Sequence, residues 1–462
     1  MHKLGAVSRE PHPEVPVPRQ LPLKRLSRAA VARLGRAGAR PRLRSTAAVC
    51  TTMSALAATS ILGGPSVAEP FTAAPCALKR TDAHHSEGVD TWNAAYTRPA
   101  RPLEAVLVFL SFPDSTPGTT PAELTADHFP ATSRFYERAS YGRFTLHPHP
   151  LRRWLRMPQP STSYAIRRDW DPERRAAYLR DAFTVADPAV DFSRYDVVYF
   201  VADPDAPGVD SDATKVVNLN TPLRVDGRDV RRVVTVFEQH PPDRLVLAHE
   251  TGHVFDLPDL YHRPVDGKGD WDTYVGDWDL MGSQFGLAPD LFAWHKWKLG
   301  WLGPRQVVCV RGRGPTRLTL EPLAAGPGTT VTDTSGAPAF GLGDGVKLAL
   351  VRTGPESVLA FEARGPAGND RAACRPGVLV YRVRGGAQSG DGPIQVVDAH
   401  PRTEACWENS VYPPLADAPV ALGESFTVPG DGVRVEVEDR TPSGAWTVKI
   451  TPGVEGGGAE GM

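Results

Sequence analysis

The sequence predicts an α+β region followed by a β-rich region. Apolar, strand-like runs mix with helix-like segments up to about residue 300, and short β-rich runs bounded by Gly, Pro and Asp follow them. At 462 residues the chain is long enough for two domains and a leader. We therefore expect an α+β domain at 103–302 and an all-β, sandwich-like domain at 303–452.

Residues 1–68 are predicted to be a basic leader that ends in a secretory signal. Arg and Lys are frequent before position 46, and the small-residue, apolar run Thr46–Leu62 follows them. This run is too short and too polar to span a bilayer, so we expect no stable membrane insertion. Small residues at Ser66 and Ala68 predict cleavage after Ala68 and a secreted protein. The alternative is a disordered basic tail on a cytosolic protein.

Charge and cysteine content narrow the class of protein. Lys and Arg number 52 against 53 acidic residues, so no charge field favours nucleic acid as a partner. Cys76, Cys309, Cys374 and Cys406 remain after the leader, an even number that is compatible with two disulfides. Three pairings are open, and we favour Cys374 with Cys406. Residues 69–102 are predicted to be an N-terminal arm or a short pro-segment. Cys76 lies in this segment and has a second interpretation, as a thiolate that caps a metal ion in a latent precursor.

Five segments define the expected α+β region. Apolar, β-branched and aromatic runs predict strands at Val106–Leu110, Val197–Val201 and Val233–Phe237. Helices are predicted at Pro121–Leu124 and Ser133–Ala139.

The β-rich region shows no convincing 3.6-residue period. Its clearest strand-like runs are Thr316–Leu320, Val346–Val351, Val358–Glu362, Val378–Val383, Val433–Val437 and Trp446–Ile450. A Gly-rich tail at 453–462 follows, for which no fold is predicted.

The segment His249-Glu250-Thr251-Gly252-His253 has the spacing of a metal site. On a helix that begins near Asp243, His249 and His253 lie one turn apart on the same face, so both imidazoles can reach one zinc ion. Glu250 lies beside the pair and is the predicted general base toward the attacking water. The alternative is a surface helix with two solvated histidines.

Asp256 and Asp259 are the two candidates for a third ligand. Pro258 ends the helix, and Asp259 stands ten positions after His249, as in the extended metallopeptidase motif that has Gly in the turn. Asp256 occupies that Gly position, and Asp is among the few other residues that adopt positive φ. We predict Asp259 as the ligand and Asp256 as the turn former, with Asp256 as a ligand left open.

The motif at 249–261 together with Trp278–Ser283 resembles the immune inhibitor A-like family of secreted zinc metalloproteases, and the resemblance extends to 135–142 and Ala293–Trp301. It implies a metzincin-like catalytic domain that binds Zn2+. It also implies that Met281 lies in a turn that forms a hydrophobic floor beneath the zinc ligands. Without the resemblance, Met281 is interpreted as ordinary core.

The resemblance also points to secondary sites. Tyr261, Tyr274 and His262 are candidates for stabilising an oxyanion, with a structural role as the alternative for each. Family members often bind Ca2+, and the acidic segments Asp203–Asp212 and Asp266–Asp277 offer oxygen ligands. The alternative for both segments is a solvated acidic loop.

These observations together predict a secreted zinc endopeptidase that hydrolyses internal bonds of protein or peptide substrates. Val233–Phe237 is the candidate edge strand for pairing with such a peptide. One alternative is a secreted surface- or polymer-binding protein with a non-catalytic zinc site. Aminopeptidases and deformylases, which use the same motif, are another.

Overall fold

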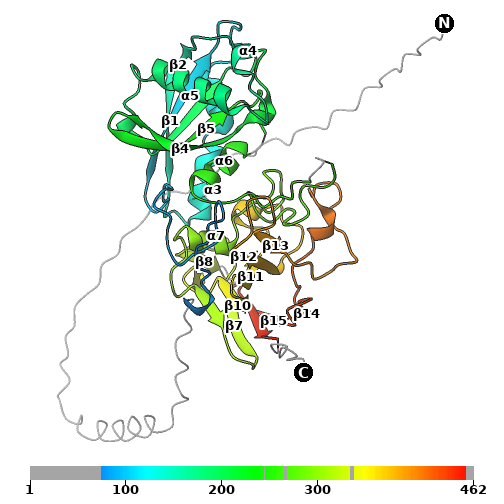
Figure 1. Ribbon diagram of the computed structural model, residues 1–462. Coiled ribbons are helices and arrows are strands. Elements are labelled where there is room, and N and C mark those ends of the chain that lie inside the picture. Colours follow the sequence, from blue (N-terminus) through cyan, green and yellow to red (C-terminus); the bar gives the residue numbers. More distant parts are fainter. Residues whose placement is uncertain (1–73, 244, 265–267, 333–337, 454–462) are drawn as a thin grey trace, which may run out of the picture. The chain divides into compact units, whose positions relative to one another are not determined.

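The structure is a computed structural model that describes residues 74–243, 245–264, 268–332 and 338–453. Its first half is built around a five-stranded sheet (Figure 1). The strand order is β2-β1-β3-β5-β4, in which β4 alone pairs antiparallel to its neighbour. The strands are β1 (Leu103–Ser111), β2 (Leu146–Arg156), β3 (Val197–Ala202), β4 (Lys215–Val225) and β5 (Arg228–Val236). The predicted strands thus lie in β1, β3 and β5.

Helices cover both faces of this sheet because its central strands are apolar on both sides (Figure 1). Along β1, Leu107 and Phe109 pack with α3 and α6, whereas Val106 and Val108 pack with α5 on the opposite face. The helices are α2 (Pro121–His128), α3 (Ala131–Ala139), α4 (Ser161–Tyr164), α5 (Pro172–Ala186), α6 (Val246–Val254) and α7 (Ala293–Lys298). The two predicted helices correspond to α2 and α3.

The edge of the sheet differs from our expectation. We chose Val233–Phe237 as the edge strand, but β5 lies between β3 and β4. That choice was wrong because β4, a strand with polar residues such as Lys215 and Asn218 among its apolar ones, was not recognised. The exposed edge of the sheet on this side is therefore β4.

Two larger sheets and a hairpin make up the β-rich half. Their orders are β13-β12-β11-β10-β6, β14-β15-β16-β7 and β8-β9. The strands are β6 (Val307–Val310), β7 (Thr316–Leu320), β8 (Thr329–Thr332), β9 (Pro338–Leu342), β10 (Leu348–Gly354), β11 (Ser357–Arg364), β12 (Gly377–Arg384), β13 (Ile394–Val396), β14 (Ser425–Thr427), β15 (Arg434–Arg440) and β16 (Trp446–Thr451). All six predicted runs coincide with or overlap observed strands.

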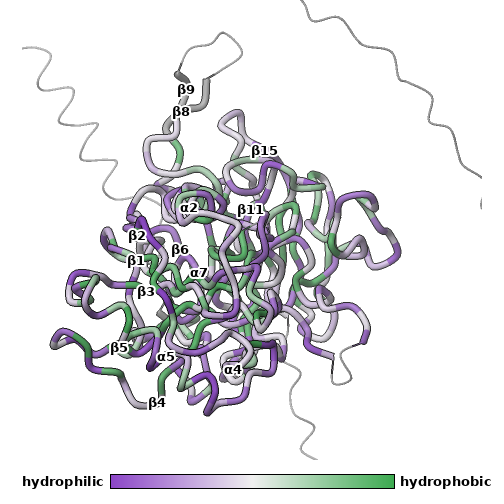
Figure 2. The backbone as a smooth tube through the Cα atoms, turned by 90° about the horizontal axis from the view of Figure 1, so that it is seen from above, coloured by the Kyte–Doolittle hydropathy of each residue, from purple (hydrophilic) through white to green (hydrophobic). Residues whose placement is uncertain are grey.

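The first of these sheets is buried on both faces. Along β10, Ala349 and Val351 pack against apolar residues of β15 and β16, as the facing sheets of a sandwich do. Leu348 and Leu350 point the other way, into a core that also contains residues of α3 and α6. One hydrophobic core therefore runs across the predicted boundary near residue 302. In Figure 2 the apolar segments run through the interior, with hydrophilic segments around them.

Two disulfides tie distant segments together. Cys374 pairs with Cys406, which confirms the pairing that we favoured. Cys76, in a short 3-10 helix (Ala74–Cys76), pairs with Cys309 of β6. The interpretation of Cys76 as a metal-capping thiolate is therefore wrong, because its sulfur is bonded to another sulfur. Two disulfides fit an extracellular location.

Two predictions fall largely outside the described residues. They are the leader at 1–68 with cleavage after Ala68, and the tail at 453–462, of which only Gly453 is described. Among the described residues, no helix combines the length and the apolar character needed to cross a membrane.

Candidate metal centre

Helix α6 carries His249, Glu250 and His253, and every one of its residues is buried. It begins at Val246, three residues later than we predicted, because Leu245 has a φ of 61° and cannot be part of a right-handed helix. The alternative of a surface helix with solvated histidines is therefore wrong. Burial of this kind requires that each imidazole has polar partners.

The three predicted ligands meet at one point. Nε2 of His249 and Nε2 of His253 lie 3.3 Å and 3.1 Å from Oδ1 of Asp259. Two ligand atoms at about 2.0 to 2.1 Å from a tetrahedral zinc ion are about 3.3 Å apart. Among the described residues, this is the one group of three or more candidate ligands within reach of a single ion. The separations of these three atoms therefore fit a zinc ion.

Backbone carbonyls hold both imidazoles in the orientation that a metal requires. Nδ1 of His249 lies 2.9 Å from the carbonyl oxygen of Leu280, and Nδ1 of His253 lies 2.8 Å from that of Leu257. Because a carbonyl only accepts, each Nδ1 carries a proton and donates it. In the neutral imidazole, Nε2 then keeps the lone pair with which histidine binds metal ions.

The turn after α6 brings Asp259 back toward the helix. Asp256 has a φ of 67°, the left-handed conformation that we predicted for it. The Asp256 N–H donates to the carbonyl of His253 and the Leu257 N–H donates to that of Gly252, which is the Schellman pattern of a helix end. The Asp256 carboxylate contacts Arg80 and His85 of the N-terminal arm, and it does not belong to the group of ligand atoms.

Met281 lies directly against helix α6. It is fully buried, and a Cβ added to Gly252 would come within 2.4 Å of its sulfur. Glycine at this position of the motif therefore lets the thioether approach α6 closely. The carbonyl of Met281 also accepts the N–H of Leu260, 2.9 Å away, beside Asp259. Met281 thus packs against α6 beside Asp259, and its role as a floor beneath the ligands stays a prediction.

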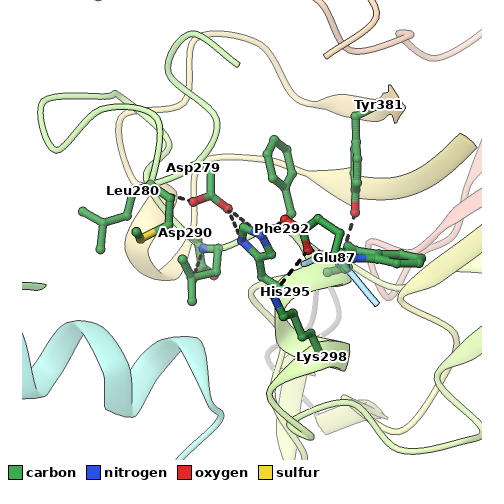
Figure 3. Close-up of polar contacts among 12 residues, drawn as sticks. Glu87, Asp279, Leu280, Asp290, Phe292, His295, Lys298 and Tyr381 are labelled. Carbon is green, nitrogen blue, oxygen red and sulfur yellow. Dashed lines mark hydrogen bonds and ion pairs between the residues drawn. The ribbon is translucent and has the colours of Figure 1, made fainter. Parts of the chain in front are cut away.

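A buried ionic network holds the turn that contains Leu280 (Figure 3), and the next residue, Met281, is bonded to it through its backbone N–H. Asp279 accepts the backbone N–H groups of Met281 at 2.8 Å and Phe292 at 2.7 Å. His295 of α7 lies between two carboxylates, with Nε2 2.9 Å from Glu87 and Nδ1 3.4 Å from Asp279. Burial disfavours its charged form, but these carboxylates outweigh burial and raise the pKa of His295 to about 9.

The ligands open onto a polar cleft of about 490 Å³. Its walls include β4 residues and the arm residues His84 and His85. Glu250 accepts the backbone N–H of Val216 on β4 at 2.9 Å, which turns its carboxylate toward the edge strand. Burial raises the pKa of Glu250, against the opposing charge of the two ligand histidines.

The pKa values of His253 and Asp259 are shifted because the two side chains lie close together. Burial opposes a charged His253, but the Asp259 carboxylate outweighs burial and raises the pKa of His253 to about 9. Burial also opposes a charged Asp259, but His253 outweighs it and holds the pKa of Asp259 well below its usual value. This carboxylate therefore remains an anion and is suited to a cation in the same place.

The three candidates for stabilising an oxyanion, Tyr261, Tyr274 and His262, lie in different surroundings. Tyr261 lines the cleft, and its ring stacks on that of His249 with centroids 6.4 Å apart. Tyr274 packs edge-on against His262, and neither is among the described residues that line this cleft. Of the three, Tyr261 alone is among the described residues that line the cleft.

In the acidic segment Asp203–Asp212, the carboxylates of Asp203 and Asp205 accept hydrogen bonds within the segment and from a neighbouring loop. Asp203 accepts the Ser115 hydroxyl at 2.5 Å and the Asp205 N–H at 3.1 Å, and Asp205 accepts the N–H of Gly118. These bonds shape turns, and Asp203 is fully buried, so it is not part of the solvated acidic loop that was the alternative. The second segment, Asp266–Asp277, falls partly outside the described residues.

Sequence reasoning did not find four residues that line the site. They are Val216, the arm residues His84 and His85, and Ser389 in the β-rich half, all of which line the cleft. The adjacent histidines were a visible signal in the arm. No local pattern distinguishes Val216 or Ser389, because only the folded chain brings them near the motif.

Comparisons with known proteins add little to this geometry. No protein-family model matches the chain, and neither does any curated protein. Among solved structures, the crystal structure of wild-type OgpA from Akkermansia muciniphila is similar over 79% of this chain and 96% of its own. The sequence identity is 12% and the TM-score is 0.25, so this likeness carries no conclusion about fold or function.

Proposed function

We propose that this chain is a secreted zinc endopeptidase of the immune inhibitor A-like, metzincin-like type. The observation that carries the proposal is the approach of the His249 and His253 Nε2 atoms to Oδ1 of Asp259, with both Nδ1 atoms tied to backbone carbonyls. A bound zinc ion would supply a Lewis acid that polarises the peptide carbonyl and makes water more acidic.

Glu250 is the proposed general base. It follows His249 directly in α6 and lines the same cleft as the three ligands, and burial favours its taking up a proton. It would accept the proton of the attacking water and then deliver it to the leaving amine. The backbone N–H of Val216 holds the carboxylate in place for both transfers.

Strand β4 is the proposed docking edge for the substrate backbone. It is the edge strand of its sheet and supplies Lys215, Val216 and Asn218 to the cleft wall. An extended peptide that pairs with this edge would lie beside Glu250. Tyr261, which stacks on His249, is the proposed side chain nearest to the oxyanion.

The experiment uses the purified full chain and an unfolded protein as substrate. We expect digestion that a zinc chelator abolishes and added zinc restores, and we expect Glu250→Gln to lower kcat at least about 100-fold because it removes the proton acceptor. Glu137→Gln, on the exposed face of α3, is the matched control and should behave as wild type.

Mass spectrometry of the products distinguishes the competing functions. Internal cleavage supports an endopeptidase, whereas trimming from the amino end indicates an aminopeptidase. A zinc-loaded, folded protein that cleaves no member of a broad peptide library would support a binding protein. Full activity of Glu250→Gln would contradict the assigned base.

A further inference from the structure

The loop between β12 and β13 meets three of the four polar groups of Asp259. The Asp259 N–H donates to Oγ of Ser389 at 2.8 Å, and the same hydroxyl donates to Oδ2 of Asp259 at 3.1 Å. The N–H of Gly390 donates to the Asp259 carbonyl at 3.0 Å. The remaining group, Oδ1, is the atom that faces His249 and His253.

The chemistry of a hydroxyl suits this double contact. Serine has one proton to donate and two lone pairs that accept, so it can bond to an N–H and a carboxylate oxygen together. With Oδ2 occupied by Ser389, the carboxylate presents one oxygen to the two imidazoles. This arrangement fixes the side-chain rotation of Asp259 before any ion is bound.

The loop that carries Ser389 is itself held from both sides. Arg384, at the end of β12, bonds to the carbonyl of Gly392 through Nε at 3.0 Å and Nη2 at 2.7 Å. From the N-terminal arm, the Thr81 hydroxyl donates to the carbonyl of Gly385 at 2.7 Å. The backbone N–H of His84 donates to Oε1 of Gln388 at 3.1 Å. Ser389 therefore sits on a braced segment.

We propose that Ser389 is a positioning residue for the metal-binding carboxylate of Asp259. Through it the β-rich half completes the metal centre. This inference rests on the proposed function, since it concerns the same ion. It adds a residue that lies 130 positions from Asp259 in sequence and belongs to no part of the motif.

The test measures zinc affinity directly, on the full chain freed of metal, by competition with a chromogenic chelator. We expect Ser389→Ala to weaken zinc binding by about 10- to 100-fold, the range found when a group that orients a metal ligand is removed. Ser389→Thr retains a hydroxyl and should recover most of the affinity. Ser357→Ala, a half-buried serine bonded to Thr353 in the same half, should bind as wild type.

The melting temperature of each metal-free variant separates positioning from folding. A purely structural role for Ser389 would lower this temperature and leave the zinc dissociation constant of the folded fraction unchanged, which would overturn the proposal. Wild-type zinc affinity in Ser389→Ala would overturn it as well. If the wild-type chain binds no zinc, the proposed function fails first, and this inference fails with it.

Discussion

Arg80 and Asp256 are 176 residues apart in sequence and form an ion pair, with 2.5 Å between Nη2 and Oδ2. The other oxygen of Asp256 lies 3.1 Å from Nδ1 of His85, whose ring stacks on that of His253 with centroids 5.5 Å apart. Asp256, the residue that ends helix α6, thus also anchors the N-terminal arm. A glycine would allow the same turn but would make neither contact.

Asp256→Asn should destabilise the fold and leave metal binding intact. Asparagine tolerates positive φ, so the turn is kept, but the charge that pairs with Arg80 is lost. We expect a loss of about 2 kcal/mol, less than the 3 to 5 typical of a broken buried pair, because Arg80 is 19% exposed and keeps some solvation. Denaturant unfolding measures this loss.

The zinc content per folded molecule distinguishes the role of Asp259 from that of Asp256. Asp259→Ala should lose zinc, whereas Asp256→Asn should retain it. Asp82→Asn, an exposed aspartate of the arm, is the control and should change neither property. The reverse pattern, with zinc lost in Asp256→Asn, would make Asp256 the third ligand.

The His295 network should make stability fall at alkaline pH. The pKa of His295 is about 9 in the folded chain and about 6.5 for a free histidine. The stabilisation is complete below pH 6.5 and is lost as pH rises through 9, because the folded state binds the extra proton. A tenfold difference in proton affinity corresponds to about 1.4 kcal/mol, so the stabilisation is on the order of a few kcal/mol.

Unfolding of wild type and His295→Gln between pH 6 and pH 10 tests this expectation. The difference in free energy of unfolding should shrink as pH rises, because only the wild type loses a bound proton. His147→Gln, at a half-exposed surface site, should parallel the wild type. A difference that stays constant with pH would show that His295 is neutral in the folded chain. The charged groups that pair with His295 are Glu87 and Asp279, and Lys298 pairs with Glu87.

The two disulfides should differ in their contribution to stability. The Cys76–Cys309 bond closes a segment of 233 residues and the Cys374–Cys406 bond one of 32. Chain entropy then makes the first bond about 2 kcal/mol more stabilising than the second. Double Cys→Ser variants of each pair, compared by denaturant unfolding, measure the difference. Equal losses would contradict the chain-entropy argument and would indicate residual structure in the unfolded chain.

The local features of the site were accessible from sequence. The spacing of His249 and His253 follows from helix geometry, and Asp256 adopts the left-handed turn that its residue type permits. Apolar runs identified β1, β3 and β5 because buried strands need no polar alternation. These are short-range effects, so a single sequence contains them.

The long-range features were not accessible. Strand β4 carries polar residues and borders the cleft, which hid it from a search for apolar runs. Helix α5 is rich in Arg and shows only a weak apolar stripe, although Asp171 and Pro172 at its start are ordinary helix signals that we overlooked. Ser389 reaches Asp259 only after two halves of the chain have packed together.

The contact between Ser389 and Asp259 limits how this chain can be divided. A fragment that stops at residue 302 keeps both histidines, Glu250 and Asp259, yet it lacks the hydroxyl that holds the carboxylate. Recombination that replaced the β-rich half would keep the histidine motif but lose Ser389, which we propose orients Asp259. We therefore expect the two halves to be inherited together, as a single evolutionary unit.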